Sequence, residues 1–315
     1  MTTTNSGRSP LSLSLIGVPN SAGSYAPGQE RTPRVLREAG LIEALIGTGA
    51  QVIDAGDLPK HIWAPDRQSP RAQNAAAVVE SLIELAERVR TELAHGRRVL
   101  VIGGNCTIAT GALAGLQHHA TQPCGLLYID RHFDMNTPDT TREGALDWMG
   151  LGHAFGLPGS LPEWTSAFGD GPLTRAGQVA FLGVDPSQGN DFERENVFRL
   201  ALDVTTQQEL IDDPRRAAQA ALDALPKAPF AVHIDVDVLD FTDAPLAENT
   251  SGRNRGPTLC QLTSALETIL ADQRWRVLTI GEINPTRADG APETLIAFNE
   301  SLATAVLAAI TPPAI

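Results

Sequence analysis

The chain has 315 residues, a formal net charge of −13 at neutral pH and a hydrophobic content of 42%, which suits a sizeable buried core. The negative charge disfavours a nucleic-acid partner or an anionic membrane, because phosphate binding requires a basic face. No run of 18 apolar residues predicts a membrane span, and the polar N-terminus does not resemble a signal peptide. The three cysteines do not suggest a disulfide framework, so we expect a cytoplasmic protein.

Apolar runs of strand length alternate with helical patterns along nearly the whole chain. Residues 1–10 predict a disordered polar tail, and residues 11–315 a single domain, because no long linker divides them. In chain order the predicted strands cover 11–19, 51–56, 97–105, 124–130, 178–184, 230–238 and 275–284. The predicted helices cover 33–46, 73–95, 107–119, 206–224, 258–272 and 295–310. This alternation is typical of an α/β fold with a mostly parallel sheet, and loops at 156–173 and 239–257 are long enough to shape a binding site.

Acidic clusters follow three of these apolar runs. The first is Asp130-Arg131-His132-Phe133-Asp134, the second is His233-Ile234-Asp235-Val236-Asp237, and the third contains Glu282. Each falls at the C-terminal end of a predicted strand, the edge at which ligands bind parallel sheets. Carboxylates that converge there need a compensating cation, and the simplest compensation is a pair of metal ions.

Within the first cluster, alternate residues face the same side of a strand ending, so Asp130, His132 and Asp134 can point at one centre. Two carboxylates and an imidazole are good ligands for Mn²⁺ or Zn²⁺. An N-cap with a surface ion pair would explain one such cluster. Because Asp235, Asp237 and Asp240 repeat the arrangement, a binuclear metal site is the better interpretation.

Two further residues fit the same edge of the sheet. Glu282 could cap a turn, but its place after a strand favours a carboxylate that holds a cationic substrate beside the metals. Cys106 follows the glycine turn Gly103-Gly104, which lacks the lysine of a phosphate-binding loop. It could be a buried small hydrophobic residue, although its position suggests a thiolate metal ligand.

These clusters resemble the motifs of the ureohydrolases, the family of arginase, agmatinase and their relatives. The chain carries a D-x-H-x-D motif at 130–134, a D-x-D-x-x-D motif at 235–240 and an E-x-N-P motif at 282–285. Segments at 17–19, 27–28 and 32–37 resemble the opening strand, loop and helix of the family, so the resemblance covers nearly the whole length. It implies one three-layer α/β/α domain, an arginase-like fold.

The resemblance also implies a mechanism with two Mn²⁺ ions bridged by a hydroxide. Asp130 and Asp235 would bridge the metals, His132 and Asp237 would bind one ion, and Asp134 would bind the other and hold the hydroxide. Glu282 would accept the guanidinium group of a small guanidino substrate. Asp240 would support the ligands from behind. Attack on the guanidinium carbon would then release an amine together with urea or a urea analogue, and relatives of this kind are commonly homo-oligomers.

The chain departs from the family pattern at the metal centre and at the proton shuttle. Asn105-Cys106 replaces the family's Asp-His, so one metal position could hold a different ion or stay empty, leaving one Mn²⁺ instead of two. The family's shuttle histidine falls at Asp147, and His153 lies near enough in sequence to be an alternative.

The chain also departs from the pattern where arginases hold the amino-acid end of the substrate. Asn136 and Thr141 are retained, whereas Glu143 and Ala145 replace polar positions. A carboxylate at Glu143 would repel an α-carboxylate, which favours a modified arginine or another guanidino compound over arginine. Some arginase-like enzymes that act on modified arginines carry a similar cysteine.

Three functions are therefore open. The leading hypothesis is a Mn²⁺-dependent hydrolase of C–N bonds in guanidino or amidino compounds. The loss of two histidines motivates a second, a non-catalytic or single-metal structural or regulatory protein. The third is a metal-dependent deacetylase, because that class has a related architecture, but it needs catalytic histidines that are not evident beside the glycine turn.

Overall fold

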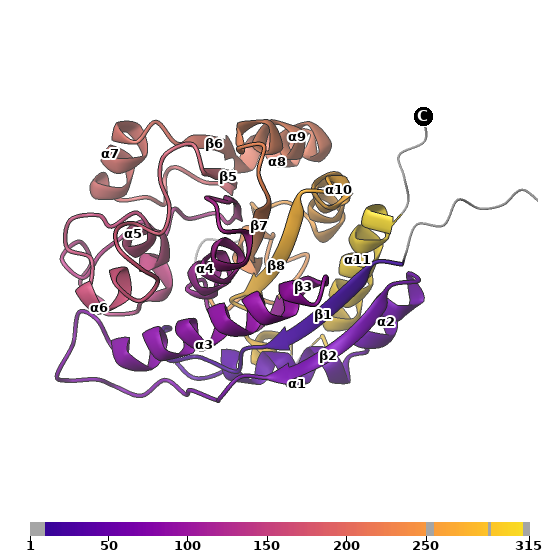
Figure 1. Cartoon of the computed structure of the whole chain (residues 1–315), viewed down its shortest axis with the longest axis horizontal. Coiled ribbons are helices and arrows are strands. Elements are labelled where there is room, and N and C mark those ends of the chain that lie inside the picture. Colours follow the sequence, from indigo (N-terminus) through magenta and orange to yellow (C-terminus); the bar gives the residue numbers. More distant parts are fainter. Residues whose placement is uncertain (1–9, 250–254, 289–290, 311–315) are drawn as a thin grey trace, which may run out of the picture.

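The computed structural model describes residues 10–249, 255–288 and 291–310, and the predicted N-terminal tail lies outside these residues except for Pro10. Eight strands form one sheet in the order β2-β1-β3-β8-β7-β4-β5-β6, and all paired neighbours are parallel (Figure 1). The strands are β1 (Ser12–Gly17), β2 (Gln51–Asp57), β3 (Arg98–Ile102), β4 (Gly125–Ile129), β5 (Val179–Val184), β6 (Asp203–Thr206), β7 (Phe230–Asp235) and β8 (Trp275–Gly281). The predicted α/β class with a parallel sheet is confirmed.

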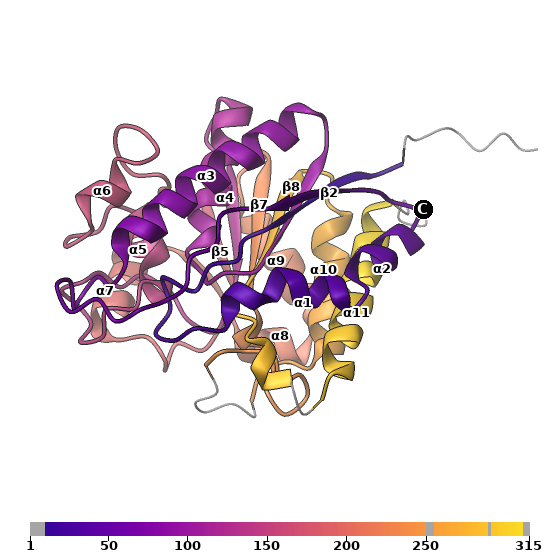
Figure 2. The same ribbon diagram turned by 90° about the horizontal axis from the view of Figure 1, so that it is seen from below.

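Helices cover both faces of the sheet. They are α1 (Thr32–Glu38), α2 (Leu41–Gly47), α3 (Ala75–Ala94), α4 (Ile108–Ala120), α5 (Gly150–Ala154), α6 (Pro162–Thr165), α7 (Asp191–Arg199), α8 (Gln207–Asp212), α9 (Pro214–Ala224), α10 (Leu259–Ala271) and α11 (Glu293–Ile310). Figure 2 shows α3 and α4 on one side and α1, α2 and α8 to α11 on the other. This is the predicted three-layer arrangement.

The strand sequences explain why both faces are covered. Along β4, Leu127 and Ile129 belong to the core beneath α9, α10 and α11, whereas Leu126 and Tyr128 belong to the core beneath α3 and α4. Successive strand residues point to opposite faces, so an uninterrupted apolar run has to be buried on both sides. The aliphatic strands therefore build two cores, one on each face.

Two helices predicted from the sequence are each broken in the structure. The helix predicted over 33–46 divides into α1 and α2, because Gly40 takes a left-handed conformation with φ of 84°. The helix predicted over 206–224 divides into α8 and α9 at Asp213, whose side chain accepts a hydrogen bond from Arg216 N. A residue before proline is pushed out of the helical region, which explains the break ahead of Pro214.

Four of these elements were not predicted: α7, β6 and the short helices α5 and α6, of which α6 lies in the segment 156–173 predicted as a loop. The sequence analysis missed α7, which begins at a capping box formed by Asn190 and Glu193. It also missed β6, a four-residue strand at the edge of the sheet. Neither segment carries enough apolar residues to show a clear period, because α7 is strongly polar and β6 has a single apolar side chain.

By length and composition, α11 would be able to cross a membrane. In this fold the apolar side of α11 packs in the hydrophobic core, since Leu295, Phe298 and Leu302 are buried in the core that α10 and α2 share. Core helices of soluble proteins satisfy the same two criteria. The packing of α11 therefore explains its apolar sequence.

Helices α3 and α4 pack closely at a glycine, which generates a stability prediction. A Cβ atom on Gly115 would lie 2.4 Å from Ala86 O and 2.8 Å from Val89 Cβ. We expect Gly115→Ala to lower the free energy of unfolding by about 1–3 kcal/mol, because the added methyl group forces the two helices apart. The urea concentration at half-unfolding measures this change.

Gly47→Ala is the matched control for that substitution. Gly47 ends α2, and a Cβ atom there would meet nothing within 4 Å. The same change should leave stability unaltered or raise it by about 0.5–1 kcal/mol, because alanine restricts the unfolded chain more than glycine does. Equal unfolding midpoints for wild type and Gly115→Ala would contradict the packing argument.

Candidate functional site

The predicted site residues follow the four central strands of the sheet. In the order β3-β8-β7-β4 these strands are neighbours, and they are followed or closed by Cys106, Glu282, Asp235 and Asp130 respectively. Their C-terminal ends meet at one edge, where parallel α/β sheets bind ligands. The strand order thus brings together residues that are up to 176 positions apart in the sequence.

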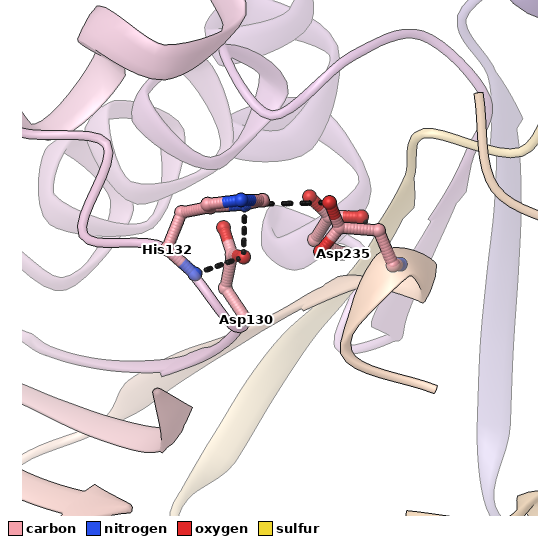
Figure 3. A group of neighbouring side chains, drawn as sticks. Asp130, His132 and Asp235 are labelled. Atoms are coloured by element: carbon pink, nitrogen blue, oxygen red, sulfur yellow. Dashed lines mark hydrogen bonds and ion pairs between the residues drawn. The ribbon is translucent and has the colours of Figure 1, made fainter. Parts of the chain in front are cut away.

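Asp130, His132, Asp235 and Asp237 form the first donor group. One ligand atom from each lies within 4.8 Å of the others. His132 Nδ1 is 3.3 Å from Asp130 Oδ1 and 3.3 Å from Asp237 Oδ2. Figure 3 shows the His132 ring lying across Asp130, with Asp235 beside them. Three carboxylates and one imidazole around a single point make a plausible site for a divalent ion.

Cys106, Asp130 and Asp134 form a second donor group under the same 4.8 Å limit. It shares Asp130 with the first group. The Cys106 thiol also donates a hydrogen bond to Asp235 Oδ2 at 3.3 Å, so the two groups are in direct contact. The geometry therefore offers two adjacent cation positions, with Asp130 available to both.

The burial of this cluster fits bound cations. Asp130 is fully buried, and its Oδ2 atom has no hydrogen-bond partner within the described part of the chain. Burial, followed by repulsion from neighbouring carboxylates, raises the pKa of Asp134 and of Asp235 well above the usual range. A divalent ion would reverse this effect by stabilising the charged forms. The residues present therefore fit a pair of divalent ions.

Burial and nearby carboxylates also shift the pKa values of His132 and Cys106. Burial alone would lower the pKa of His132, but Asp237 and Asp130 outweigh it and raise that pKa to about 10. Burial, followed by Asp235, raises the pKa of the Cys106 thiol well above its ordinary value. A bound metal deprotonates a coordinating thiol outright, so Cys106 could act as a ligand only together with the ion.

Glu282 and Asp134 have left-handed backbones, with φ of 66° and 51°. Residues other than glycine rarely adopt this conformation, and they keep it only when their surroundings fix them. The Glu282 carboxylate accepts hydrogen bonds from Cys106 N at 3.0 Å and from Gln29 Nε2 at 2.5 Å. Asp134 Oδ2 accepts one from the Tyr128 hydroxyl at 2.5 Å. Both carboxylates are therefore held in defined orientations.

A pocket of about 460 Å³ opens over the cluster. Its lining includes eight predicted site residues: Cys106, His132, Asp134, Glu143, Asp147, Asp235, Asp237 and Glu282. Burial is the largest influence on Asp147 and raises its pKa to about 7. The structure thus brings the metal-binding, guanidinium-binding and proton-transfer candidates into one space.

Other residues that the sequence analysis singled out lie outside this lining. Asn136 is buried and its Oδ1 atom accepts hydrogen bonds from Thr140 and Asn190, while Thr141 donates one to the carbonyl of Glu143. Asp240 Oδ1 accepts hydrogen bonds from the backbone N–H and the hydroxyl of Thr242. The predicted substrate contacts of Asn136 and Thr141 and the supporting role of Asp240 stay predictions.

His153 is a core residue. Its Nδ1 atom lies 2.7 Å from the carbonyl oxygen of Met149, and its ring stacks on Trp164 at 4.4 Å. Burial lowers its pKa to about 4, so it is neutral at pH 7. Because His153 is absent from the pocket lining, Asp147 is the better placed of the two residues considered for proton transfer.

Sequence reasoning missed five residues of the site. Tyr25, Trp148 and Asn249 line the pocket, while Gln29 and Tyr128 bind the two strained carboxylates. Tyr128 could have been identified from the sequence, because a tyrosine in an aliphatic strand needs a partner for its buried hydroxyl. Gln29 and Trp148 lie in single turns of 3-10 helix and Tyr25 and Asn249 lie in loops, and these segments are too short for a local pattern to mark them.

Comparison with known proteins places this site in a family. A model of the Arginase family matches residues 11–308. Bacillus caldovelox arginase is 30% identical over 238 residues, covering 74% of this chain and 78% of its own. Mouse arginase-1 is 29% identical over 299 residues, covering 93% and 91%.

Solved structures agree with the sequence comparison. The structure of Bacillus caldovelox arginase superposes with a TM-score of 0.84 at 27% identity, covering 94% of this chain and 98% of that one. The structure of Trypanosoma cruzi formiminoglutamase with Mn²⁺ has a TM-score of 0.69 at 19% identity, covering 96% and 95%, which shows a shared fold. With its parallel sheet, its Asp/His cluster and a family match over nearly its whole length, this chain belongs to the arginase family.

Proposed function

We propose that this arginase-family hydrolase uses Mn²⁺ to cleave a C–N bond of a guanidino or amidino compound, releasing an amine and urea or a urea analogue. One observation carries the proposal: two donor groups share the buried Asp130, and their other members line a pocket that Glu282 also lines. When bound, two divalent ions would supply a water of lowered pKa as the nucleophile.

The chain provides a ligand set for each ion. Asp130, His132, Asp235 and Asp237 would hold one, and Cys106, Asp130 and Asp134 the other. The contact between Cys106 and Asp235 is consistent with Asp235 reaching both positions, as the family resemblance implies. The hydrogen bond from Tyr128 orients Asp134, leaving its second oxygen for an ion or for the attacking water.

Glu282 and Asp147 have separate tasks in this proposal. Glu282 would bind the guanidinium group, since carboxylates form charge-assisted hydrogen bonds with planar nitrogen cations. Asp147 lies in the same pocket, and with a pKa of about 7 it would hold a proton near neutral pH. A positioned acid of that pKa suits proton transfer to the departing amine.

The charge of the pocket lining restricts which substrates can bind. Glu143 and Asp147 line it together with the aromatic side chains of Tyr25 and Trp148, and no lysine or arginine occurs among the described lining residues. A free α-carboxylate would meet negative charge there without a cation to bind it. This arrangement supports a modified arginine or another guanidino compound as the preferred substrate over arginine itself. A cytoplasmic location and homo-oligomeric assembly complete the proposal.

Metal content tests whether Cys106 is a ligand. We expect wild type expressed with Mn²⁺ to hold about two ions per chain, because two donor groups are present. Cys106→Ala should lose one ion and Cys106→His should keep both, as elemental analysis would measure. Cys260→Ser, at an exposed cysteine, is the control and should match wild type.

One ion in wild type but two in Cys106→His would show that the cysteine leaves its position empty. No metal in a stable wild-type protein would favour a non-catalytic subunit.

Metal removal should change how stability depends on pH. Folding raises the pKa of Asp134, Asp235 and Glu282, so the metal-free protein loses stability as pH rises through these raised values. Metal-free Asp235→Asn should therefore melt at a higher temperature than metal-free wild type at pH 8, although it binds Mn²⁺ less tightly. Asp223→Asn, at an exposed residue of α9, should not differ from wild type. A metal-free Asp235→Asn protein less stable than wild type at pH 8 would contradict the electrostatic argument.

Urea release tests the reaction itself. Mn²⁺-loaded wild type should release urea or a urea analogue from at least one member of a broad guanidino panel, with compounds that carry a free α-carboxylate among the poorer substrates. Glu282→Gln should lower kcat/KM by about 10- to 100-fold, because it removes a charged hydrogen-bond acceptor. Glu80→Gln, at an exposed position of α3, is the control. Absence of turnover across the panel would end the proposal, and turnover of acetylated amines alone would indicate a deacetylase.

A further inference from the structure

A short segment near the N-terminus, residues 28–32, docks against residues 282–284 at the end of β8. Thr32 Oγ1 donates a hydrogen bond to Ile283 O at 2.6 Å. Gly28 packs so closely on Asn284 that a Cβ atom there would lie 2.7 Å from Asn284 Nδ2. Between these two contacts, Gln29 reaches Glu282. The first part of the chain therefore supports the residue proposed to bind the guanidinium group.

The backbone of Glu282 is fixed from two sides. Its N–H donates to Gly104 O at 3.0 Å, and its carbonyl accepts from Glu248 N at 2.9 Å. These bonds hold Glu282 in its left-handed conformation. They do not determine the orientation of its carboxylate, since the side chain can still rotate about its own bonds.

Two donors fix the carboxylate instead, one on each oxygen. Cys106 N binds Oε1 at 3.0 Å and Gln29 Nε2 binds Oε2 at 2.5 Å. Each carboxylate oxygen can accept two hydrogen bonds, so one acceptor position remains on each. A guanidinium group presents paired N–H donors that match such a carboxylate. The two protein donors thus leave the pair of acceptor positions that a planar cation needs.

Packing alone does not explain a glutamine at this position. Gln29 is completely buried, and its Oε1 atom has no hydrogen-bond partner in the described part of the chain. A buried amide oxygen without a partner costs stability, and an apolar side chain of similar size would avoid that cost. The feature that an apolar residue would lose is the hydrogen bond to Glu282.

We infer that Gln29 is a positioning residue that orients the Glu282 carboxylate toward a guanidinium or amidinium substrate. The inference rests on the proposed function, because it assigns Gln29 a role that acts only through Glu282. It makes the segment 28–32, which contains Gln29, part of the machinery for binding the substrate cation, although Gln29 itself does not line the pocket.

The decisive variant is Gln29→Met, which keeps the volume and removes the donor. We expect kcat/KM for the best substrate of the guanidino panel to fall about 10- to 100-fold, the range found when groups that orient a ligating side chain are lost. Mn²⁺ per chain should stay at the wild-type value. Gln117→Met is the control, since Gln117 Nε2 also donates to one acceptor, Leu173 O at 3.0 Å, but lies outside the pocket lining.

Two further variants separate positioning from packing. Gln29→Glu keeps the shape but replaces the donor with an acceptor, so it should lose at least as much activity as Gln29→Met. The double variant Gln29→Met/Glu282→Gln should be no worse than Glu282→Gln alone, because the role of Gln29 passes through Glu282. Wild-type kcat/KM in Gln29→Met, or independent losses in the double variant, would overturn the inference.

Crystal structures of wild type and Gln29→Met keep this test separate from the proposed function. If wild type hydrolyses no guanidino compound, the proposed reaction fails, but the orientation of the Glu282 carboxylate can still be compared. A carboxylate that rotates in Gln29→Met supports the positioning role. An unchanged carboxylate in both structures would refute it.

Discussion

Mutual repulsion among buried carboxylates is the constraint on which this molecule depends. Asp130, Asp134, Asp235 and Asp237 belong to two adjacent donor groups at the end of the sheet, where burial limits screening by water. His132 is the one ligand side chain able to carry a positive charge, and it contacts two of these carboxylates. Divalent cations would satisfy this candidate metal-binding cluster in a way that protonation would not, because protonated carboxyls would be poor ligands. In the proposed function, the acidic edge would therefore reach its working form only with metal bound.

The parallel sheet explains why such a cluster can exist at all. Four neighbouring apolar strands form a rigid support, and the acidic residues begin where the backbone hydrogen bonds between these strands end. Two of the side chains that touch the proposed chemistry, Asp134 and Glu282, have strained backbones. Strain of this kind collects at active sites because the surrounding fold can fix it. Here the fixing residues come from distant segments, Tyr128 in β4 and Gln29 beside α1.

Much of this arrangement could be predicted from the sequence, for identifiable reasons. Apolar runs ending in Asp130, Asp235 and Glu282 predicted both the strands and the edge at which the cluster forms, because strand endings are local patterns. The broken helices at Gly40 and Asp213 were missed, since apolar periodicity continues across a break in the backbone. Gln29, Tyr25 and Asn249 were missed because their roles depend on which loops meet in space. No local pattern in a single sequence shows which loops come into contact in the folded protein.

The position of β8 has a consequence for how the protein is made. β8 is the last strand in the chain, yet it lies between β3 and β7 in the middle of the sheet. During synthesis, the β2-β1-β3 part of the sheet cannot be hydrogen-bonded to the β7-β4-β5-β6 part until residues 275–281 have been made. The reason is that such non-local strand pairings form only when both strands are available. The ligands on β4 and β7 can assemble before Glu282 arrives. A nascent chain would therefore assemble the donor group of Asp130, His132, Asp235 and Asp237 before the group that also needs Cys106, which follows β3 and joins the others only through β8.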